Sequence, residues 1–556
     1  MEELNKLNEI LDISKSKKSI IFNNLLKYKL ENIIDISQDV YKDTLIDKWA
    51  GELPVLEGSK ILINNIIHNP INNKTLLEER QQSYIEYNDI DLEILKEYED
   101  DILWTFTLDN EIDEESSINL LYPSNFIIKY MNYIEPVLDL YHMYKIYGVP
   151  LISLSYPVSI IYGPYYYMNR YFNFNISVKN YIKMLYSFMK IYTKSTGNFK
   201  YDLLKLITLI AYIGLYAYSM YQTFEMAFLI YKTKEKLHKK MEGLVLFINE
   251  SKNIISKIPY NILKPFLDKD IIYNEINLSN TMTDIYRLWK DNTIKNNIKS
   301  LLKIIYTIDI INSISRLKDS NDWCETKYSN ITKMWGMKNP LLNTNQISNP
   351  INLSKNIIIT GPNAAGKTTY VKSILSNIIL SQTFGISNCI KSETILYDTI
   401  NSFMRITDIL GSKSYFEVET EYCSLMIKKA IEMNKNGKKG LFLLDEPMHS
   451  TPPTEGMATA YAVIEFIGKL NGLNLIITTH FHKLIELETN YPTNFINLSV
   501  EAIKNDNKFY FPYKIKRGYS HQCIAIELLE KQKFPQDVIE SAIKMKNKIY
   551  NDICSK

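Results

Sequence analysis

The chain has 556 residues, 46% of them hydrophobic, and a formal net charge of only +2 at pH 7. A chain of this length can bury several cores, and roughly three or four folding units are expected. The near-neutral charge argues against a uniformly basic nucleic-acid coat and gives no support for electrostatic DNA binding by the whole molecule. The dispersed cysteines lack metal-ligand spacing and the N-terminus lacks a secretory signal, so we expect reduced thiols and an intracellular protein.

The N-terminal half of the chain is expected to be largely helical. Residues 1–70 carry no motif that indicates a function, and residues 71–335 are predicted to form a helical core that ends in a helix around residues 301–317. One basic cluster in this core could contact nucleic acid, but a solvated helix face is the favoured interpretation. The cluster comprises Lys232, Lys234, Lys236, Lys239 and Lys240.

Two uncharged runs interrupt this helical core, at residues 146–169 and 206–224. Each is close to the roughly 20 residues that a membrane helix requires. Tyrosines crowd the ends of the runs, as in an interfacial belt, and proline is better tolerated in membrane helices than in soluble ones. The runs therefore predict a membrane-inserted or membrane-surface hairpin at about residues 146–231. A buried part of a soluble helical core is the alternative, although neither run has a polar stripe of helical period.

A glycine-rich turn stands between an apolar run, residues 356–359, and a helical pattern. Backbone N–H groups of such a turn cradle phosphates, its lysine reaches the β- and γ-phosphates, and its threonine hydroxyl binds Mg²⁺. Lys367 and Thr368 would take the last two roles. We therefore expect a nucleotide site made of Gly361, Pro362, Asn363, Ala364, Ala365, Gly366, Lys367, Thr368 and Thr369.

Two further apolar strands end in residues that could act on the nucleotide. The strand at residues 440–444 leads into Asp445, which would hold the hydrated metal ion, and Glu446, which would polarise the attacking water. The strand at residues 473–477 leads to His480, where a γ-phosphate sensor would lie; a strand-end histidine without a chemical role is the alternative. The Asp-Glu pair is typical of ATPases related to ABC transporters, so ATP is the expected nucleotide.

The P-loop has a feature beyond the general nucleotide-binding motif, because Gly361-Pro362-Asn363 precedes Gly366-Lys367-Thr368. In this feature it resembles the P-loop of the MutS mismatch-repair ATPases. Other segments that are similar to this family occur in the same order along the chain. The resemblance is strong over residues 338–542 and weaker from residue 76 onward. The similar segments are residues 76–81, 338–342, 380–385, 414–419, 445–456, 479–480, 513–518 and 535–542.

The resemblance implies a fold, a site and partners. The fold would be an α/β P-loop ATPase of the ABC and MutS type at residues 336–515, preceded by a mostly α-helical core and lever at 71–335 and followed by a helical tail at 516–556. The active unit would be a homodimer or a MutS-like heterodimer, in which Ser414 of one subunit reaches the γ-phosphate bound by the other. The implied partner is double-stranded or branched DNA, with a role in repair or recombination.

The sequence also departs from the family pattern. No Phe-x-Glu wedge for unstacking a mispair occurs in the chain, and the segment before Arg80 is shorter than the two domains that normally precede the core. We therefore expect a protein that lacks the N-terminal mismatch-recognition domain. Pro452 and Pro453 stiffen the loop that normally signals between subunits. The alternative function is that of a membrane-anchored ABC-like ATPase that acts at a membrane rather than on DNA.

Overall fold

The computed structural model describes most of the chain and divides it into two compact units. Unit 1 comprises Met1–Asn24, Ile94–Asn253 and Ile272–Leu301, and unit 2 comprises Leu25–Glu93, Ile254–Ile271 and Leu302–Lys556. The described residues are 11–27, 33–85, 90–106, 120–123, 125, 128–268, 271, 274–342, 345–404, 415–449, 452–505, 508–520, 522, 532 and 534–554.

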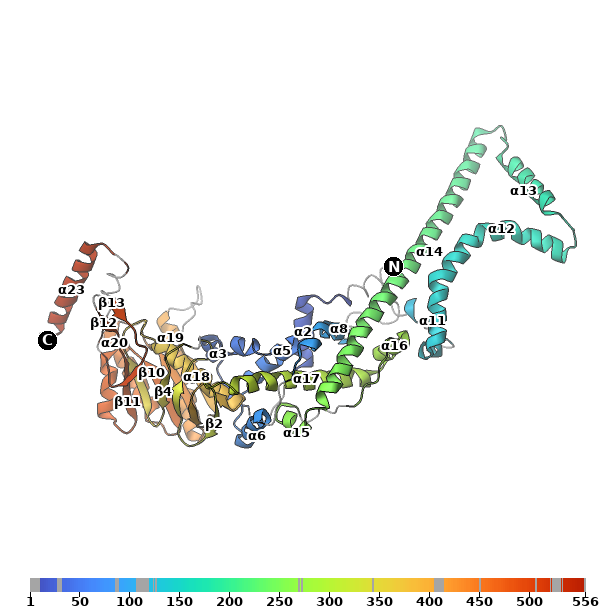
Figure 1. The fold of residues 1–556 in the computed structure, drawn as a ribbon. Helices are drawn as coiled ribbons and strands as arrows, with labels where there is room; N and C mark the ends of the chain where they lie inside the picture. The colour runs from blue at the N-terminus through green and yellow to red at the C-terminus, as the bar shows by residue number, and fades with distance from the viewer. Residues whose placement is uncertain are drawn as a thin grey trace. The chain divides into compact units, whose positions relative to one another are not determined.

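Within the described residues, unit 2 is built around a seven-stranded sheet, whose strands β10 and β11 are labelled in Figure 1. The strand order is β1-β8-β9-β10-β5-β11-β14. Neighbouring strands are parallel except for β14, which runs antiparallel to β11. The central strands are apolar and buried, as expected for a parallel sheet that is covered on both faces. The strands are β1 (Asp35–Ile36), β5 (Asn356–Thr360), β8 (Thr399–Phe403), β9 (Gly440–Asp445), β10 (Leu473–Thr478), β11 (Phe495–Val500) and β14 (Ile515–Arg517).

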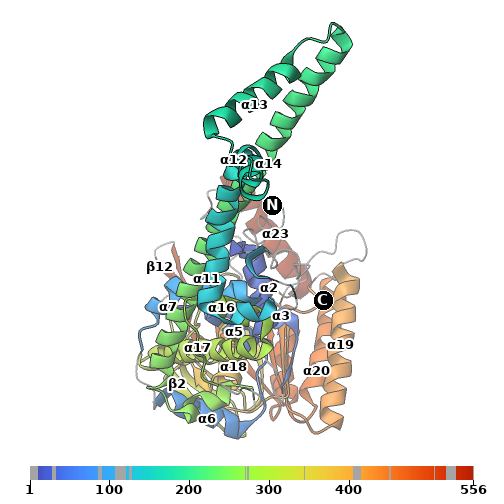
Figure 2. The same ribbon diagram turned by 90° about the vertical axis from the view of Figure 1, so that its right-hand side faces the viewer.

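Helices cover the sheet and complete its core. Helices α19 (Tyr415–Lys435) and α20 (Pro453–Gly468) lie side by side (Figure 2), and Ala430 and Ile464 pack with Phe442 and other strand residues in one buried cluster. The helix after the P-loop, α18 (Lys367–Thr383), contacts two N-terminal helices of the same unit. These are α3 (Gln38–Thr44) and α5 (Glu57–Ile67).

Smaller elements surround this core. A mixed five-stranded sheet has the order β4-β3-β7-β2-β6, and β12 pairs with β13 as an antiparallel ribbon. The strands are β2 (Cys324–Tyr328), β3 (Lys333–Met337), β4 (Asn349–Asn352), β6 (Ile386–Ser387), β7 (Lys391–Thr394), β12 (Ile503–Asn505) and β13 (Lys508–Tyr510). The other helices of this unit are α4 (Ile46–Gly51), α6 (Lys74–Ile85), α15 (Tyr260–Leu263), η4 (Lys264–Phe266), η5 (His482–Ile485), α21 (Glu486–Asn490) and α23 (Gln536–Cys554).

The N-terminal part of the chain is grouped differently from the sequence-based boundary at residue 70. Strand β1 adds to the edge of the main sheet, where the N–H of Asp35 donates to the carbonyl of Asp398 at 3.1 Å and the N–H of Ser37 donates to that of Ile400 at 3.1 Å. Arg80 is fully buried and its guanidinium donates to the carbonyls of Pro265, at 3.1 Å, and Thr383. These hydrogen bonds explain why residues 25–93 belong to the unit that carries the P-loop.

Unit 1 is helical in its described residues. Its small core is aromatic: Trp289 packs edge-on against Trp104 and Tyr122, and the hydroxyl of Tyr122 donates to the carbonyl of Met282 at 2.9 Å. The elements are α2 (Lys15–Leu25), α7 (Glu93–Tyr98), α8 (Asp100–Leu103), η1 (Trp104–Phe106), η2 (Lys129–Tyr133), α11 (Glu135–Met143), η3 (Tyr144–Gly148), α12 (Val149–Tyr171), α13 (Val178–Thr193), α14 (Phe199–Ile255), α16 (Met282–Lys290) and the first part of α17 (Asn292–Lys318).

The two uncharged runs lie on η3 with α12, and on α14, and their large apolar side chains face solvent. Ile160 is 57% exposed and Ile210 is 61% exposed. The helical segments Glu135–Tyr171 and Phe199–Ile255 are long and apolar enough to cross a membrane, judged by length and composition. In the most apolar stretch of each segment, 6% and 0% of the residues are buried. The alternative of a buried helical core does not describe these runs in the structure, because their large apolar side chains are mostly exposed. Membrane contact stays a prediction.

Candidate functional site

The turn between β5 and α18 adopts a conformation that side chains resist. Gly361 has φ 150° and Gly366, which precedes the first residue of α18, has φ 93°. A Cβ atom at Gly361 would lie 2.3 Å from the carbonyl oxygen of Val500, so only glycine fits there. Ala364 holds a left-handed φ of 64° despite its side chain. The loop therefore wraps tightly at the N-terminus of α18, where backbone N–H groups favour an anion.

The strand register brings the acidic residues Asp445, the last residue of β9, and Glu446, which follows it, to the same edge of the sheet as this turn. Thr478 of β10 pairs with Asp445 on one side and with Ile359 of β5 on the other. The hydroxyl of Thr368 donates to Oδ2 of Asp445 at 3.0 Å, and the hydroxyl of Thr478 donates to Oδ1 of the same carboxylate. Asp445 is thus oriented from both sides by threonine hydroxyls.

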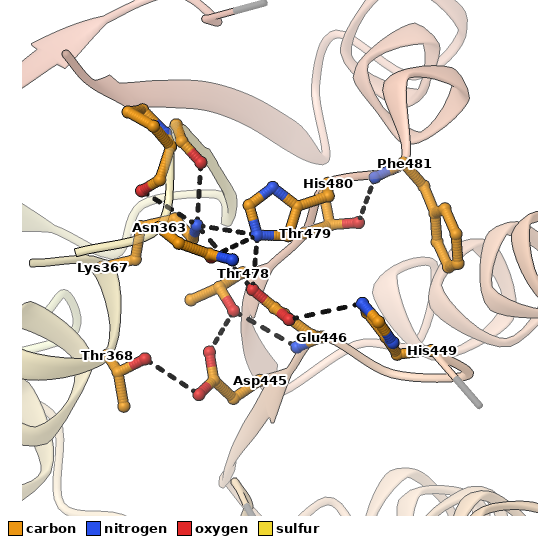
Figure 3. Close-up of polar contacts among 12 residues, drawn as sticks. Asn363, Lys367, Thr368, Asp445, Glu446, His449, Thr478, Thr479, His480 and Phe481 are labelled. Carbon is orange, nitrogen blue, oxygen red and sulfur yellow. Dashed lines mark hydrogen bonds and ion pairs between the residues drawn. The ribbon is translucent and has the colours of Figure 1, made fainter. Parts of the chain in front are cut away.

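Three charged or titratable side chains converge beside this carboxylate (Figure 3). His480 Nε2 lies 2.7 Å from Glu446 Oε1, and Lys367 Nζ lies 3.7 Å from the same oxygen. Lys367 Nζ also lies 3.1 Å from His480 Nε2, and it donates to the carbonyl of Gly361 at 2.8 Å. The Asn363 amide oxygen lies 2.8 Å from His480 Nε2. The P-loop, the end of β9 and the residue after β10 therefore meet at one point.

Strain and electrostatics single out Glu446. Its backbone has φ 51°, in the left-handed region, and its N–H donates to the carbonyl of Thr478 at 3.0 Å, which holds this conformation. The hydrogen bond from His480, followed by the attraction of nearby cations, lowers the pKa of the Glu446 carboxyl. Burial lowers the pKa of the Lys367 ammonium. The glutamate is therefore held in its ionised form beside a largely desolvated lysine.

A cavity of about 720 Å³ opens over the P-loop, within the range typical of small-molecule sites. Residues 362–370 form one wall, and Phe511 and Tyr513 line another. The two aromatic rings stack with centroids 6.1 Å apart, and a Cβ atom on Gly366 would lie 3.0 Å from the Tyr513 ring. A flat aromatic surface therefore lies directly beside a phosphate-binding turn, which suits a ligand with both a base and phosphates.

The donor set at this site fits a magnesium nucleotide. The hydroxyl of Thr368 and the carboxylate of Asp445 are hard oxygen donors, and Mg²⁺ usually takes only one or two carboxylates from the protein with the rest of its ligands from phosphates and water. Within the described ranges, no cluster of three or more His, Cys, Asp or Glu side chains could hold a metal ion by itself. The arrangement thus suits a metal ion that arrives with its nucleotide rather than a resident ion.

The structure brings together most of the residues that the sequence singled out. Asn363, Lys367, Thr368, Asp445, Glu446 and His480 share direct contacts. Ser414 lies outside the described residues. Sequence reasoning missed Thr478 and Tyr513 as site residues. Thr478 could have been noticed as a polar residue that ends an apolar strand. Tyr513 begins a segment that resembles the MutS family, residues 513–518, but nothing in that segment marks the tyrosine as lining the site.

A glycine-rich turn follows β5 and an Asp-Glu pair stands at the end of β9, with β10 between these two strands; this arrangement defines a P-loop nucleotide-binding domain. Residues 357–550 match MutS domain V. The chain is 26% identical over 263 residues to the DNA mismatch repair protein MutS of Streptococcus pyogenes serotype M1, covering 44% of this chain and 30% of that protein. The same protein of serotype M49 (strain NZ131) matches with the same identity and coverage.

The C-terminal part of the chain is therefore related to the MutS family and matches its domain V over residues 357–550. It covers less than a third of the length of these relatives, because the aligned region is 30% of each. The relationship thus includes the nucleotide-site residues from the P-loop to the Glu446–His480 pair, which lie within the matched range.

Proposed function

We propose that this chain is an ATPase that binds ATP with Mg²⁺ and acts as an ATP-gated dimer on DNA. The observation that carries the proposal is the convergence of Lys367, Glu446 and His480 beside the Thr368–Asp445 pair. Each of these groups has a role in nucleotide hydrolysis that its position supports. The proposed location is intracellular.

The nucleotide would be held by its phosphates and its base. The N–H groups of the P-loop and the ammonium of Lys367 would bind the phosphates, and the aromatic face of Tyr513 would stack on the base. Thr368 and Asp445 would hold Mg²⁺, which when bound neutralises charge on the phosphate oxygens. Thr478 would keep the Asp445 carboxylate oriented toward the ion, because its hydroxyl occupies the other carboxylate oxygen.

Glu446 is the proposed base for the attacking water. Its lowered pKa keeps it ionised, so that it can accept a proton from water or orient the water by a hydrogen bond. His480 contacts both this carboxylate and the P-loop residue Asn363, so it is placed to respond to a γ-phosphate at the loop and to pass that change to Glu446. The role of His480 is therefore that of a sensor.

The dimer and the DNA partner rest on the family relationship. The resemblance at residues 414–419 supports Ser414 as the group that completes the site of the opposite subunit. The matched relatives are named for DNA mismatch repair, and by this likeness we propose double-stranded or branched DNA as the partner, with a role in repair or recombination. ATP would control DNA binding by changing the dimer contact.

The experiment that tests this function measures nucleotide binding and turnover by the purified full-length chain. We expect saturable binding of a fluorescent ATP analogue that requires Mg²⁺, is displaced by ATP, and is accompanied by slow hydrolysis that DNA alters. Failure to bind ATP would overturn the nucleotide proposal. Hydrolysis that is unaffected by duplex and branched DNA, together with no DNA binding at low salt, would overturn the DNA proposal alone.

A further inference from the structure

The tip of unit 1 exposes more apolar surface than a water-soluble helix pair can explain. We define the tip as α12, α13 and the first part of α14 up to residue 224 (Figure 1). Large apolar side chains are exposed along all three segments, including Val158 at 65%, Phe188 at 63% and Leu215 at 66%. Surface helices normally confine apolar residues to one stripe that packs on a core. Here they occur without such packing, so the tip needs an apolar partner.

The prolines of α12 give a second, independent observation. Pro157 cannot donate to the carbonyl of Ser153, and that carbonyl accepts instead from the hydroxyl of Tyr216 on α14 at 2.9 Å. A second contact between helices lies near Pro164, where the hydroxyl of Tyr181 on α13 donates to the carbonyl of Ile161 at 2.8 Å. Solvent water could donate to the freed carbonyl of Ser153, whereas lipid acyl chains carry no hydrogen-bond donor. An internal partner for a carbonyl freed by proline, as at Ser153, is the arrangement required of helices in a lipid environment.

The hydroxyl side chains of the apolar helices are also satisfied internally. Ser155 and Ser159 donate to the carbonyls of Ile152 and Tyr156, at 2.8 and 2.7 Å. On α14, Thr208 donates to the carbonyl of Lys205 at 2.8 Å. These side chains are exposed, yet they bond back to their own helix and present little polarity to their surroundings. These three hydroxyl groups are thus compatible with contact to acyl chains.

The excess of basic residues at the tip indicates that its partner is anionic. From residue 140 to residue 224, Asp202 is the one acidic residue, and its carboxylate accepts from Ser195 and from the N–H of Thr196 in the turn before α14. The three lysines of α13, Lys179, Lys183 and Lys190, occupy about one-ninth of the helix circumference at 3.6 residues per turn. The opposite side of α13 carries the exposed aromatic residues Phe188 and Tyr192. The basic residues of this stretch are Lys145, Arg170, Lys179, Lys183, Lys190, Lys194, Lys200 and Lys205.

We propose that the tip of unit 1 binds a lipid bilayer that contains anionic lipids. Helix α13 lies at the level of the headgroups, with Lys179, Lys183 and Lys190 facing lipid phosphates and the opposite, aromatic side facing the acyl chains. Helix α12 and residues 203–224 of α14 contact the acyl chains, and the tyrosines near their ends lie at the interface. An open apolar cavity of about 460 Å³ lies between the base of α12 and α14, and Leu154 and Phe228 are among the residues that line it. Its lining is apolar, like the surface that is proposed to contact acyl chains.

This partner accounts for features that DNA or a second copy leaves unexplained. Duplex DNA would complement the lysines but would leave the apolar side of α13 and the whole of α12 in water. A second copy of the tip would bring together two strongly basic surfaces, because each tip has seven basic residues and one acidic residue. An anionic bilayer offers both phosphate charge and hydrocarbon. The proposal concerns unit 1 and does not depend on the function proposed for the P-loop.

Flotation of the full-length protein with vesicles of phosphatidylcholine, with and without phosphatidylserine, tests the proposal. We expect flotation that is stronger with phosphatidylserine and partly resistant to elution by high salt. The double variant Lys183→Gln/Lys190→Gln should bind about 25-fold more weakly, at about fivefold per lysine. The double variant Ile210→Asn/Ile213→Asn should become fully elutable by salt, because it removes acyl-chain contact rather than charge.

Matched controls use similarly exposed residues of unit 2. Lys42→Gln/Lys74→Gln removes two exposed lysines with side chains 72% and 58% exposed, and Leu425→Asn replaces a leucine that is 61% exposed. Both controls should float like the wild type, and thermal unfolding should show that all variants are folded. The proposal is overturned if the wild type does not float with either vesicle. It is also overturned if the α13 lysine variant instead loses duplex DNA binding, or if the apolar variant loses only self-association.

Discussion

The imidazole of His480 and the carboxylate of Glu446 lie 2.7 Å apart, although they follow different strands of the sheet. Glu446 follows β9 and His480 follows β10, and Lys367 at the start of α18 approaches the same carboxylate oxygen at 3.7 Å. The hydrogen bond from His480 is the main cause of the lowered pKa of Glu446. The contact thus joins the proposed base to the proposed sensor, and both roles can be tested separately.

Replacing the proposed base should separate binding from hydrolysis. We expect Glu446→Gln to retain ATP binding, because the amide preserves the shape, and to lose turnover by about 100- to 10,000-fold, the usual contribution of a general base. Steady-state hydrolysis and a nucleotide-binding isotherm measure the two effects. Lys367→Ala is the complementary variant and should weaken ATP binding itself. Wild-type turnover in Glu446→Gln would contradict the assignment.

Removing the histidine should change the pH dependence of hydrolysis. In the wild type the lowered pKa of Glu446 keeps the carboxylate ionised to lower pH. The contribution of the pair to folding stability is therefore complete above the ordinary glutamate pKa, and it is lost as pH falls through the lowered pKa. In His480→Ala the pKa of Glu446 should rise, so the acidic limb of the kcat profile should move to higher pH. A pH–rate profile of both proteins measures this shift. An unchanged acidic limb with reduced kcat would mean that His480 acts on the nucleotide alone.

Thr478 offers a test of a residue that acts through Asp445. Thr478→Val keeps the shape of the side chain but removes the hydroxyl that donates to Asp445 Oδ1. We expect the apparent Mg²⁺ affinity in the presence of ATP to fall about 10- to 100-fold, as for other residues that orient a metal ligand. Thr478→Ser retains the hydroxyl and should remain close to wild type. Mg²⁺ titrations of ATP hydrolysis, with thermal unfolding as a check on folding, compare the three proteins.

Mixing two inactive chains tests whether the site is shared between subunits. In a dimer of one Ser414→Arg chain and one Glu446→Gln chain, one site carries both changes and the other is intact. At equal mixing, random pairing should restore about one quarter of wild-type turnover. Hydrolysis is measured across mixing ratios, with dimers verified by light scattering. If no ratio restores activity in verified dimers, Ser414 does not serve the opposite subunit.

Asp309 tests the attachment of the N-terminal segment within unit 2. Its buried carboxylate accepts from the N–H groups of Val55, at 3.2 Å, and Leu56, at 2.8 Å, just before α5. Asp309→Ala leaves both N–H groups without this acceptor and should reduce the free energy of unfolding by about 1–3 kcal/mol for each buried group. Chemical denaturation measures the change. Asp319→Ala, at an exposed position near the end of the same helix, should have almost no effect.

The P-loop and the acidic pair could be predicted from sequence because their signals are local. A run of apolar residues, a glycine at each end of a short turn and a helical pattern are contiguous from residue 356 to residue 383. The structure forms β5, the turn and α18 there. The absence of charge in residues 146–169 and 206–224 is equally local. Those residues therefore determined by themselves that two long apolar helices exist.

Other features were decided by the tertiary structure, since they depend on pairings between distant residues. The contact of Thr478 with Asp445 requires β10 to lie beside β9 in the sheet. The sequence of a single strand does not reveal which strands will lie beside it. Strand β1 spans only Asp35–Ile36, too short for a pattern of its own, and exists because the edge of β8 offers free hydrogen-bonding groups. Whether the apolar helices are covered or exposed likewise depends on which elements pack against them, and packing is a property of the folded chain.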